Sequence, residues 1–168
     1  MHDYTLPFLN DYSGLTIDKL IAMEGVYRID SLPLAVEQVL YEKLGYTPDL
    51  ALLTEAELTV LAVEALEREV NNGGYHQFFM NSSSQYAPHI VEALRRIQCL
   101  AAADLTQQAI DALNLPVLSE EEIESIIHDV DNERDHALDA LDTKFYEYPD
   151  PISERLFEYI KANKEQIR

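Results

Sequence analysis

Apolar residues recur along the chain every three or four positions, which is the spacing of an amphipathic α-helix. The pattern predicts a series of helices over about residues 16–24, 31–44, 54–70, 75–80, 88–97, 101–113, 119–145 and from Ser153 onward. No run alternates apolar and polar residues as a half-buried strand does. We therefore expect an all-α fold, a compact multi-helix single domain over residues 1–168.

Polar residues mark the ends of several predicted helices. Thr54-x-x-Glu57 and Ser119-x-x-Glu122 are capping boxes, in which a hydroxyl and a carboxylate satisfy the first free N–H groups. Asn71 to Gly74 reads Asn-Asn-Gly-Gly and is expected to end the helix that starts at Thr54, because Asn and Gly tolerate left-handed backbone. After Ser119 the helical pattern runs on until Pro149, so one long helix is predicted there.

The balance of charged residues is strongly negative. The chain has 31 Asp and Glu against 12 Lys and Arg, a net charge of -19. Direct nucleic-acid binding needs a basic surface, and docking on an anionic membrane needs one too, so we expect neither. Such an excess serves solubility, or it is neutralised by a basic partner.

The single cysteine points to a reducing compartment. Cys99 has no second cysteine with which to form an intrachain disulfide, and a buried, unreactive thiol is expected. The first residues lack the basic and then apolar pattern of a signal peptide, and no apolar run has the length of a membrane span. We therefore expect a cytoplasmic protein.

The acids gather toward the C-terminal part of the chain. Residues 117–158 hold fourteen acids against three bases. If residues 119–145 form one helix, turning about 100° per residue, several acids fall on one narrow face beside the apolar stripe. These candidate partner-binding residues are Glu121, Glu124, Asp131, Asp135, Asp139 and Asp142.

This predicted ridge is a costly arrangement for a helix. Like charges four residues apart, such as Asp131 and Asp135, destabilise a helix by a few tenths of a kcal/mol. The ridge would carry one charge per ~5 Å of helix axis, whereas duplex DNA carries one per ~1.7 Å. Imitation of DNA would therefore need further acidic ridges, or a dimer. A generic solvated helix face is the alternative interpretation.

Other candidate sites are weak. Asp129-x-Asp131-x-Glu133 resembles the start of a calcium loop, but its sixth and twelfth positions hold Arg134 and Ala140 instead of Gly and Glu. The histidines and aspartates of residues 128–136 have no second ligand cluster, so no metal and no cofactor are expected. The best polar cluster for catalysis is Asn71, Asn72, His76 and Gln77, for which we expect a structural role rather than an enzyme site.

One segment resembles a known signature. Residues 69–83 read EVNNGGYHQFFMNSS, followed by Tyr86-Ala87-Pro88 and by VEAL at 91–94. This run is similar to the signature of the bacterial DNA-mimic protein family typified by the nineteen-kilodalton DNA mimic protein. The resemblance implies a helical homodimer that binds a helix-turn-helix transcription factor in place of its operator DNA and relieves repression.

The signature contains no acidic array, so it indicates the fold more firmly than the mimicry. Three other functions stay open at this point. The partner could be another basic DNA-binding protein, such as a histone-like nucleoid protein. The chain could be an acidic adaptor without DNA-like geometry, or an enzyme that uses the Asn71–His76 region.

Overall fold

The computed structural model describes residues 5–167, and these form eight α-helices and three short 3₁₀ helices without a β-sheet. The all-α prediction is confirmed. In chain order the elements are α1 (Ile17–Ile21), α2 (Ser31–Leu44), η1 (Leu50–Leu52), α3 (Glu55–Met80), η2 (Ser82–Tyr86), α4 (Ala87–Arg96), α5 (Leu100–Ala112), α6 (Glu120–Ile127), α7 (Asn132–Phe145), α8 (Ile152–Asn163) and η3 (Lys164–Gln166).

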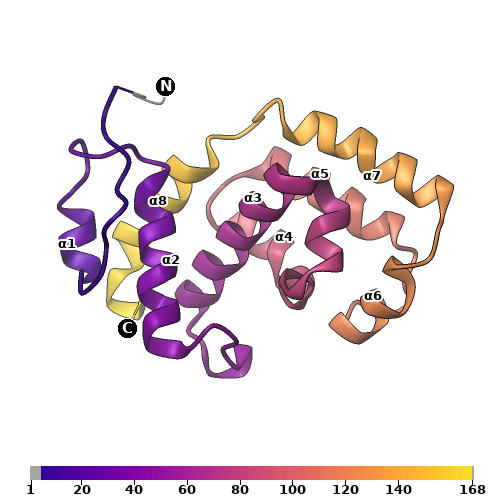
Figure 1. Cartoon of the computed structure of the whole chain (residues 1–168), viewed down its shortest axis with the longest axis horizontal. Coiled ribbons are helices and arrows are strands. Elements are labelled where there is room, and N and C mark those ends of the chain that lie inside the picture. Colours follow the sequence, from indigo (N-terminus) through magenta and orange to yellow (C-terminus); the bar gives the residue numbers. More distant parts are fainter. Residues whose placement is uncertain (1–4, 168) are drawn as a thin grey trace.

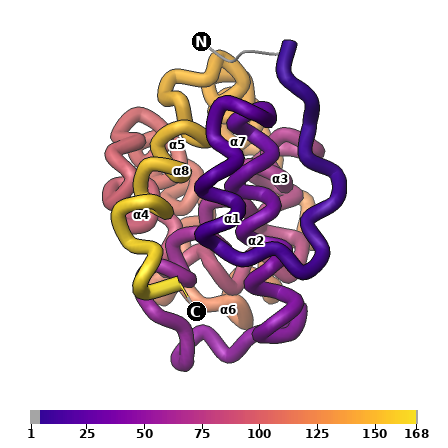
Figure 2. Tube along the Cα trace, turned by 90° about the vertical axis from the view of Figure 1, so that its left-hand side faces the viewer, coloured from indigo at the N-terminus to yellow at the C-terminus, as the bar shows by residue number. Residues whose placement is uncertain are grey.

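Helix α3 is the centre of the molecule (Figure 1) and contacts α2, α4, α6, α7 and α8. Every residue from Val60 to Leu66 is buried, so this stretch is enclosed by its neighbours. Helices α1, α2 and α8 pack together at one end of the molecule, which faces the viewer in Figure 2. Among residues 5–167, no helix has the length and apolar character needed to span a bilayer.

The prediction that Asn71–Gly74 ends a helix is only half right. Thr54 does begin α3 with a complete capping box to Glu57. The chain departs from helical geometry at Gly73 and at Gly74, whose φ is 77°, but it resumes the helix to Met80. The Asn-Asn-Gly-Gly sequence therefore makes a kink in α3, because glycine can adopt the positive φ that the kink requires.

The prediction of one continuous helix over residues 119–145 is wrong. Helix α6 ends at Ile127, and α7 begins at Asn132 after a short turn. The Asp131 carboxylate accepts hydrogen bonds of 3.1 Å from the backbone N–H groups of Glu133 and Arg134 and thereby caps α7. Val130, which the helical pattern places on the apolar stripe, is 87% exposed in this turn.

Arg134 holds the turn between α6 and α7 together. Its side chain is buried, and its guanidinium donates hydrogen bonds to the backbone carbonyls of Ile126, at 3.0 Å, and Asp129. These carbonyls lie at the end of α6, where helical partners are missing. The break between α6 and α7 is therefore a specific turn in which Arg134 satisfies two backbone carbonyls.

Candidate functional site

Most acids of residues 120–145, which comprise α6, α7 and the turn between them and are here called the acidic helix pair, face solvent. Their apolar residues Ile123, Ile127, Leu138, Leu141 and Phe145 are buried, and α6 packs on α3 while α7 packs on α3 and α5. Eight carboxylates are exposed, on Glu120, Glu121, Glu122, Glu124, Asp129, Asp131, Glu133 and Asp139. The two helices therefore present a strongly acidic surface.

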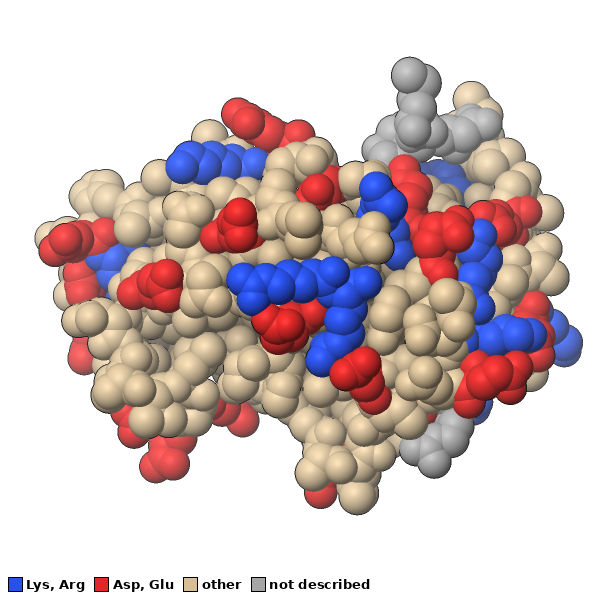
Figure 3. Space-filling model, turned by 180° about the vertical axis from the view of Figure 1, so that it is seen from behind, with Lys and Arg blue, Asp and Glu red and all other residues tan. Residues whose placement is uncertain are grey.

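Most ion pairs between an acid and a Lys or Arg lie outside the acidic helix pair. Ion pairs within the described chain engage Asp18, Glu24, Asp30, Glu37, Glu55, Glu92, Glu158 and Glu165. On the acidic helix pair they engage only Asp135, at 3.3 Å from Arg134. Figure 3 shows the same contrast on one face: blue and red side chains lie together across the centre and right, whereas the lower left edge, toward α6, is red only.

The six predicted partner-binding acids do not form one ridge, because the break at residues 128–131 separates them. Glu121 and Glu124 lie on α6, and the other four lie at the start of α7 or within it. Asp131 is the N-cap of α7, and half-buried Asp135 contacts Arg134. Among the six, Glu121, Glu124 and Asp139 are exposed without a structural hydrogen bond from their side chains in the described part of the chain.

Asp142 serves the fold. It is half-buried and accepts a 2.8 Å hydrogen bond from the backbone N–H of Tyr75, the first residue after the kink in α3. Burial raises the pKa of the Asp142 carboxyl, and the bond from Tyr75 opposes that rise. A Cβ added at Gly74 would overlap this carboxylate, so the second glycine leaves room for Asp142. Asp142 thus caps the second half of α3 from a distant helix.

The polar residues of the signature segment converge on one buried carboxylate. Glu69 is 9% exposed. It accepts hydrogen bonds of 2.8 Å from Gln77 Nε2 and Asn81 Nδ2 and of 3.1 Å from Ser83 Oγ. The structural role expected for Gln77 is found here, because Gln77, Asn81 and Ser83 together satisfy Glu69 and thereby fix the kinked end of α3.

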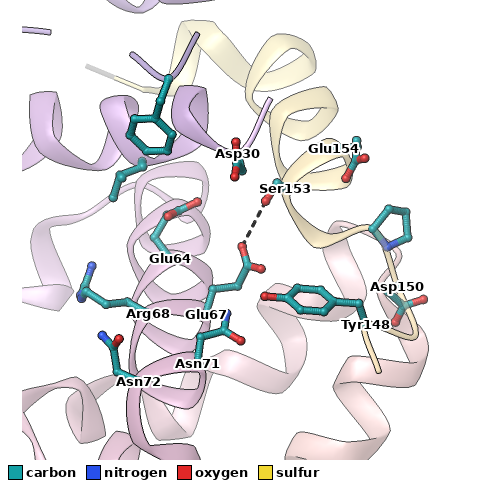
Figure 4. Close-up of a pocket in the computed structure, with 13 residues that line it drawn as sticks. Asp30, Glu64, Glu67, Arg68, Asn71, Asn72, Tyr148, Asp150, Ser153 and Glu154 are labelled. Atoms are coloured by element: carbon teal, nitrogen blue, oxygen red, sulfur yellow. Dashed lines mark hydrogen bonds between the residues drawn. The ribbon is translucent and has the colours of Figure 1, made fainter. Parts of the chain in front are cut away.

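A second site, which sequence reasoning missed, is a cavity of about 700 Å³ beside α3. Figure 4 shows Glu64 and Glu67 projecting from α3 into the space between α3 and α8. Tyr148 points toward Glu67 from the opposite side of this space. Asn71 and Asn72 also line the cavity, but His76 does not. The polar cluster that the alternative enzyme function would use is therefore divided: Asn71 and Asn72 line the cavity, whereas His76 and Gln77 do not.

The cavity holds carboxyl groups with an unusual affinity for protons. Burial raises the pKa of Glu67 to about 7, against the effect of a hydrogen bond from Ser153. Burial, together with Glu67 and Glu37, raises the pKa of Glu64 well above its ordinary value. Arg68 stands nearby, but it binds Glu37 at 2.8 and 2.9 Å. The sequence signal was available, since Glu64 stands among apolar residues of α3.

The comparisons with known proteins bear on the C-terminal two thirds of the molecule. The family of DMP19-like proteins matches residues 51–163, which is more than half of the chain. The matched range includes the kinked helix α3, the signature segment and the acidic helix pair. Neither a curated protein nor a solved structure matches the chain significantly. The chain therefore belongs to the DMP19-like protein family.

Proposed function

We propose that this protein is an acidic DNA mimic that occupies the DNA-binding surface of a helix-turn-helix transcription factor and so relieves repression. One observation carries the proposal: the acidic helix pair exposes eight carboxylates that have no ion pair within the described residues. Membership of the DMP19-like family supports the DNA-mimic class.

The mechanism is competition for basic side chains. A helix-turn-helix protein presents Lys and Arg where DNA phosphates lie. Carboxylates of Glu121, Glu124 and Asp139 would pair with these groups. Their charge density is below that of DNA, so apolar contacts must add affinity. Val117 precedes α6 in the chain and Val130 follows it; their side chains are 61% and 87% exposed and can supply such contacts.

A homodimer completes the proposal. Dimeric repressors read two half-sites about one helical turn of DNA apart. Two copies of this chain related by a two-fold axis would present two acidic helix pairs with matching symmetry. The dimer would also extend the array of negative charge beyond the length of two short helices.

A charge-reversal variant tests the surface. Glu121→Lys, Glu124→Lys and Asp139→Lys change three exposed acids and spare both Asp131, which caps α7, and Asp142, which caps α3. The partner is first captured from a lysate of the source cell with the full chain. The wild-type protein should displace a fluorescent operator from that partner, and the variant should be at least about tenfold weaker, roughly 1.4 kcal/mol.

The matched control reverses Asp11, Glu42 and Glu165, which are exposed outside the acidic helix pair. It changes the net charge equally and should displace DNA like the wild type. If both variants lose DNA displacement equally, overall charge explains the effect. If the first variant displaces DNA as well as the wild type does, the acidic helix pair is not the interface. If the captured partner is a histone-like nucleoid protein, the protein still acts as a DNA mimic, but its target is not a helix-turn-helix transcription factor.

A further inference from the structure

We propose that the cavity between α3, α8 and the start of α2 binds an aliphatic polyamine, whose ammonium groups pair with Glu64 and Glu67. The inference is independent of the proposed function, because α6 lies toward the opposite end of the molecule from α8 (Figure 1). The cavity lies within the size range of small-molecule sites.

Glu64 is the observation that points to a ligand. Its side chain is only 6% exposed and lines the cavity. Within residues 5–167 its carboxylate has no hydrogen bond and no ion pair, and Figure 4 shows it directed into the cavity. Buried carboxylates normally have partners, because an isolated buried charge is costly. A bound cation would supply the missing partner.

The neighbours of Glu64 make the cavity negative. Glu67 follows one turn later on α3, and Asp30, Asp150 and Glu154 line the same space from other segments. These three acids already have partners within the chain: Asp30 pairs with Arg28, Asp150 accepts the backbone N–H of Ala102, and Glu154 has an interaction of its own. Glu64 and Glu67 are therefore the acids best placed to receive an ammonium group.

The walls favour an organic cation over a bare metal ion. Phe8, Leu34 and Pro151 give the cavity apolar lining that can cover methylene groups. The carboxylates are dispersed, and no three His, Cys, Asp or Glu side chains in the described chain stand close enough to hold one metal ion. An extended alkyl chain with ammonium groups matches both features.

Calorimetric titration of the full chain with spermidine, near pH 7 and at about 0.15 M salt, tests the proposal. One saturable site per chain is expected. Glu64→Gln, which keeps the shape of the side chain, should weaken binding at least about tenfold. Glu42→Gln removes one exposed charge elsewhere and should leave the affinity unchanged. Wild-type affinity in Glu64→Gln, or only weak binding at several sites, would overturn the proposal.

Two further arms identify the ligand chemistry. N-acetyl-lysine methylamide represents a protein lysine, and it should bind at least about tenfold more weakly than spermidine, because it offers one ammonium instead of three. Mg²⁺ should not compete at equal concentration. If the lysine probe binds with equal affinity, the ligand is a lysine side chain of a protein and not a free polyamine. Competition by Mg²⁺ would show that spermidine binds through general charge screening.

Proton release gives a readout that does not depend on the variant. The charged groups facing Glu64 and Glu67 are Asp30, Glu37, Arg68, Asp150 and Glu154. An ammonium between the two glutamates favours their ionised forms, so protons should leave as spermidine binds near pH 7. Titrations in buffers of different ionisation enthalpy measure this release. Its absence in the wild type would place the ligand away from these carboxyls.

Discussion

Gly74 and Asp142 meet at the kink of α3 and join two parts of the chain that are far apart in sequence. Gly74 has a φ of 77°, and the Asp142 carboxylate occupies the space beside its Cα while accepting the N–H of Tyr75. On the other side of the kink, Glu69 is held by Gln77, Asn81 and Ser83. Single residues thus fix the shape of the central helix.

Replacing Gly74 with alanine should lower the free energy of unfolding by about 2–4 kcal/mol, because the new methyl group meets positive φ and the Asp142 carboxylate together. Denaturant unfolding measures the change. Gly45→Ala is the control, since Gly45 has a φ of 83° with open space around it and so reports the backbone cost alone. Equal losses in the two variants would show that Asp142 moves aside freely.

Glu67 should make the protein less stable as the pH rises. Its pKa is about 7 in the folded chain against an ordinary value of 4.5, so the folded state binds the proton more tightly. The stabilisation is complete below about pH 4.5 and is lost as the pH rises through 7. Between these limits, the wild type should lose up to about 3 kcal/mol more than Glu67→Gln does.

Denaturant unfolding at several pH values measures this difference. Glu124→Gln, a change at an exposed acid of α6, is the control and should retain the wild-type pH dependence. Parallel curves for the wild type and Glu67→Gln would mean that Glu67 titrates as an ordinary surface acid.

At the scale of elements, the break between α6 and α7 decides how the acids are displayed. Asp131 caps α7 and Arg134 binds the end of α6, so the two helices are separately terminated. The carboxylates therefore lie on two short helices rather than on one long helix. The spacing of any DNA-like charge pattern depends on the angle that this turn sets.

Asp131→Ala should destabilise the protein by about 1 kcal/mol through loss of the α7 cap. Asp129→Ala is the matched control, since Asp129 is exposed in the same turn and its side chain makes no hydrogen bond to the described residues. Thermal unfolding of both variants measures the difference. If the two melt alike, the Asp131 carboxylate contributes nothing to the start of α7.

At the scale of the whole molecule, charge is segregated rather than merely abundant. The chain carries a net charge of -19, and the ion pairs of its Lys and Arg are largely with acids outside the acidic helix pair. One end of the molecule is therefore more strongly negative than the rest. A field of this kind steers basic partners and raises association rates at low salt.

The complex with the captured partner should weaken as salt rises. Its dependence should be shallower than that of operator DNA, because fewer counterions are exchanged. Glu121→Gln with Glu124→Gln should reduce the slope of log affinity against log salt, whereas Asp11→Asn with Glu42→Gln should not. Fluorescence anisotropy at several salt concentrations measures the slopes. An affinity independent of salt would exclude carboxylates as the main contact.

The helical class, most helix positions and the acidic character of residues 117–158 follow from the amino-acid sequence alone. These features depend on local periodicity, capping residues and composition, which neighbouring residues carry. Family membership was accessible for the same reason, because the run from Glu69 to Ser83 is contiguous. The cap at Asp131 was not predicted, because the helical spacing of apolar residues continues through the turn that Asp131 ends.

Tertiary structure decided which acids serve the fold and which face solvent. Asp142 became a cap because α7 packs on the kink of α3, 67 residues away in the chain. Glu64 became a cavity wall because α8 and the start of α2 enclose α3. Local patterns contain no information about such approaches, since burial and pKa depend on which distant segments exclude water from a group.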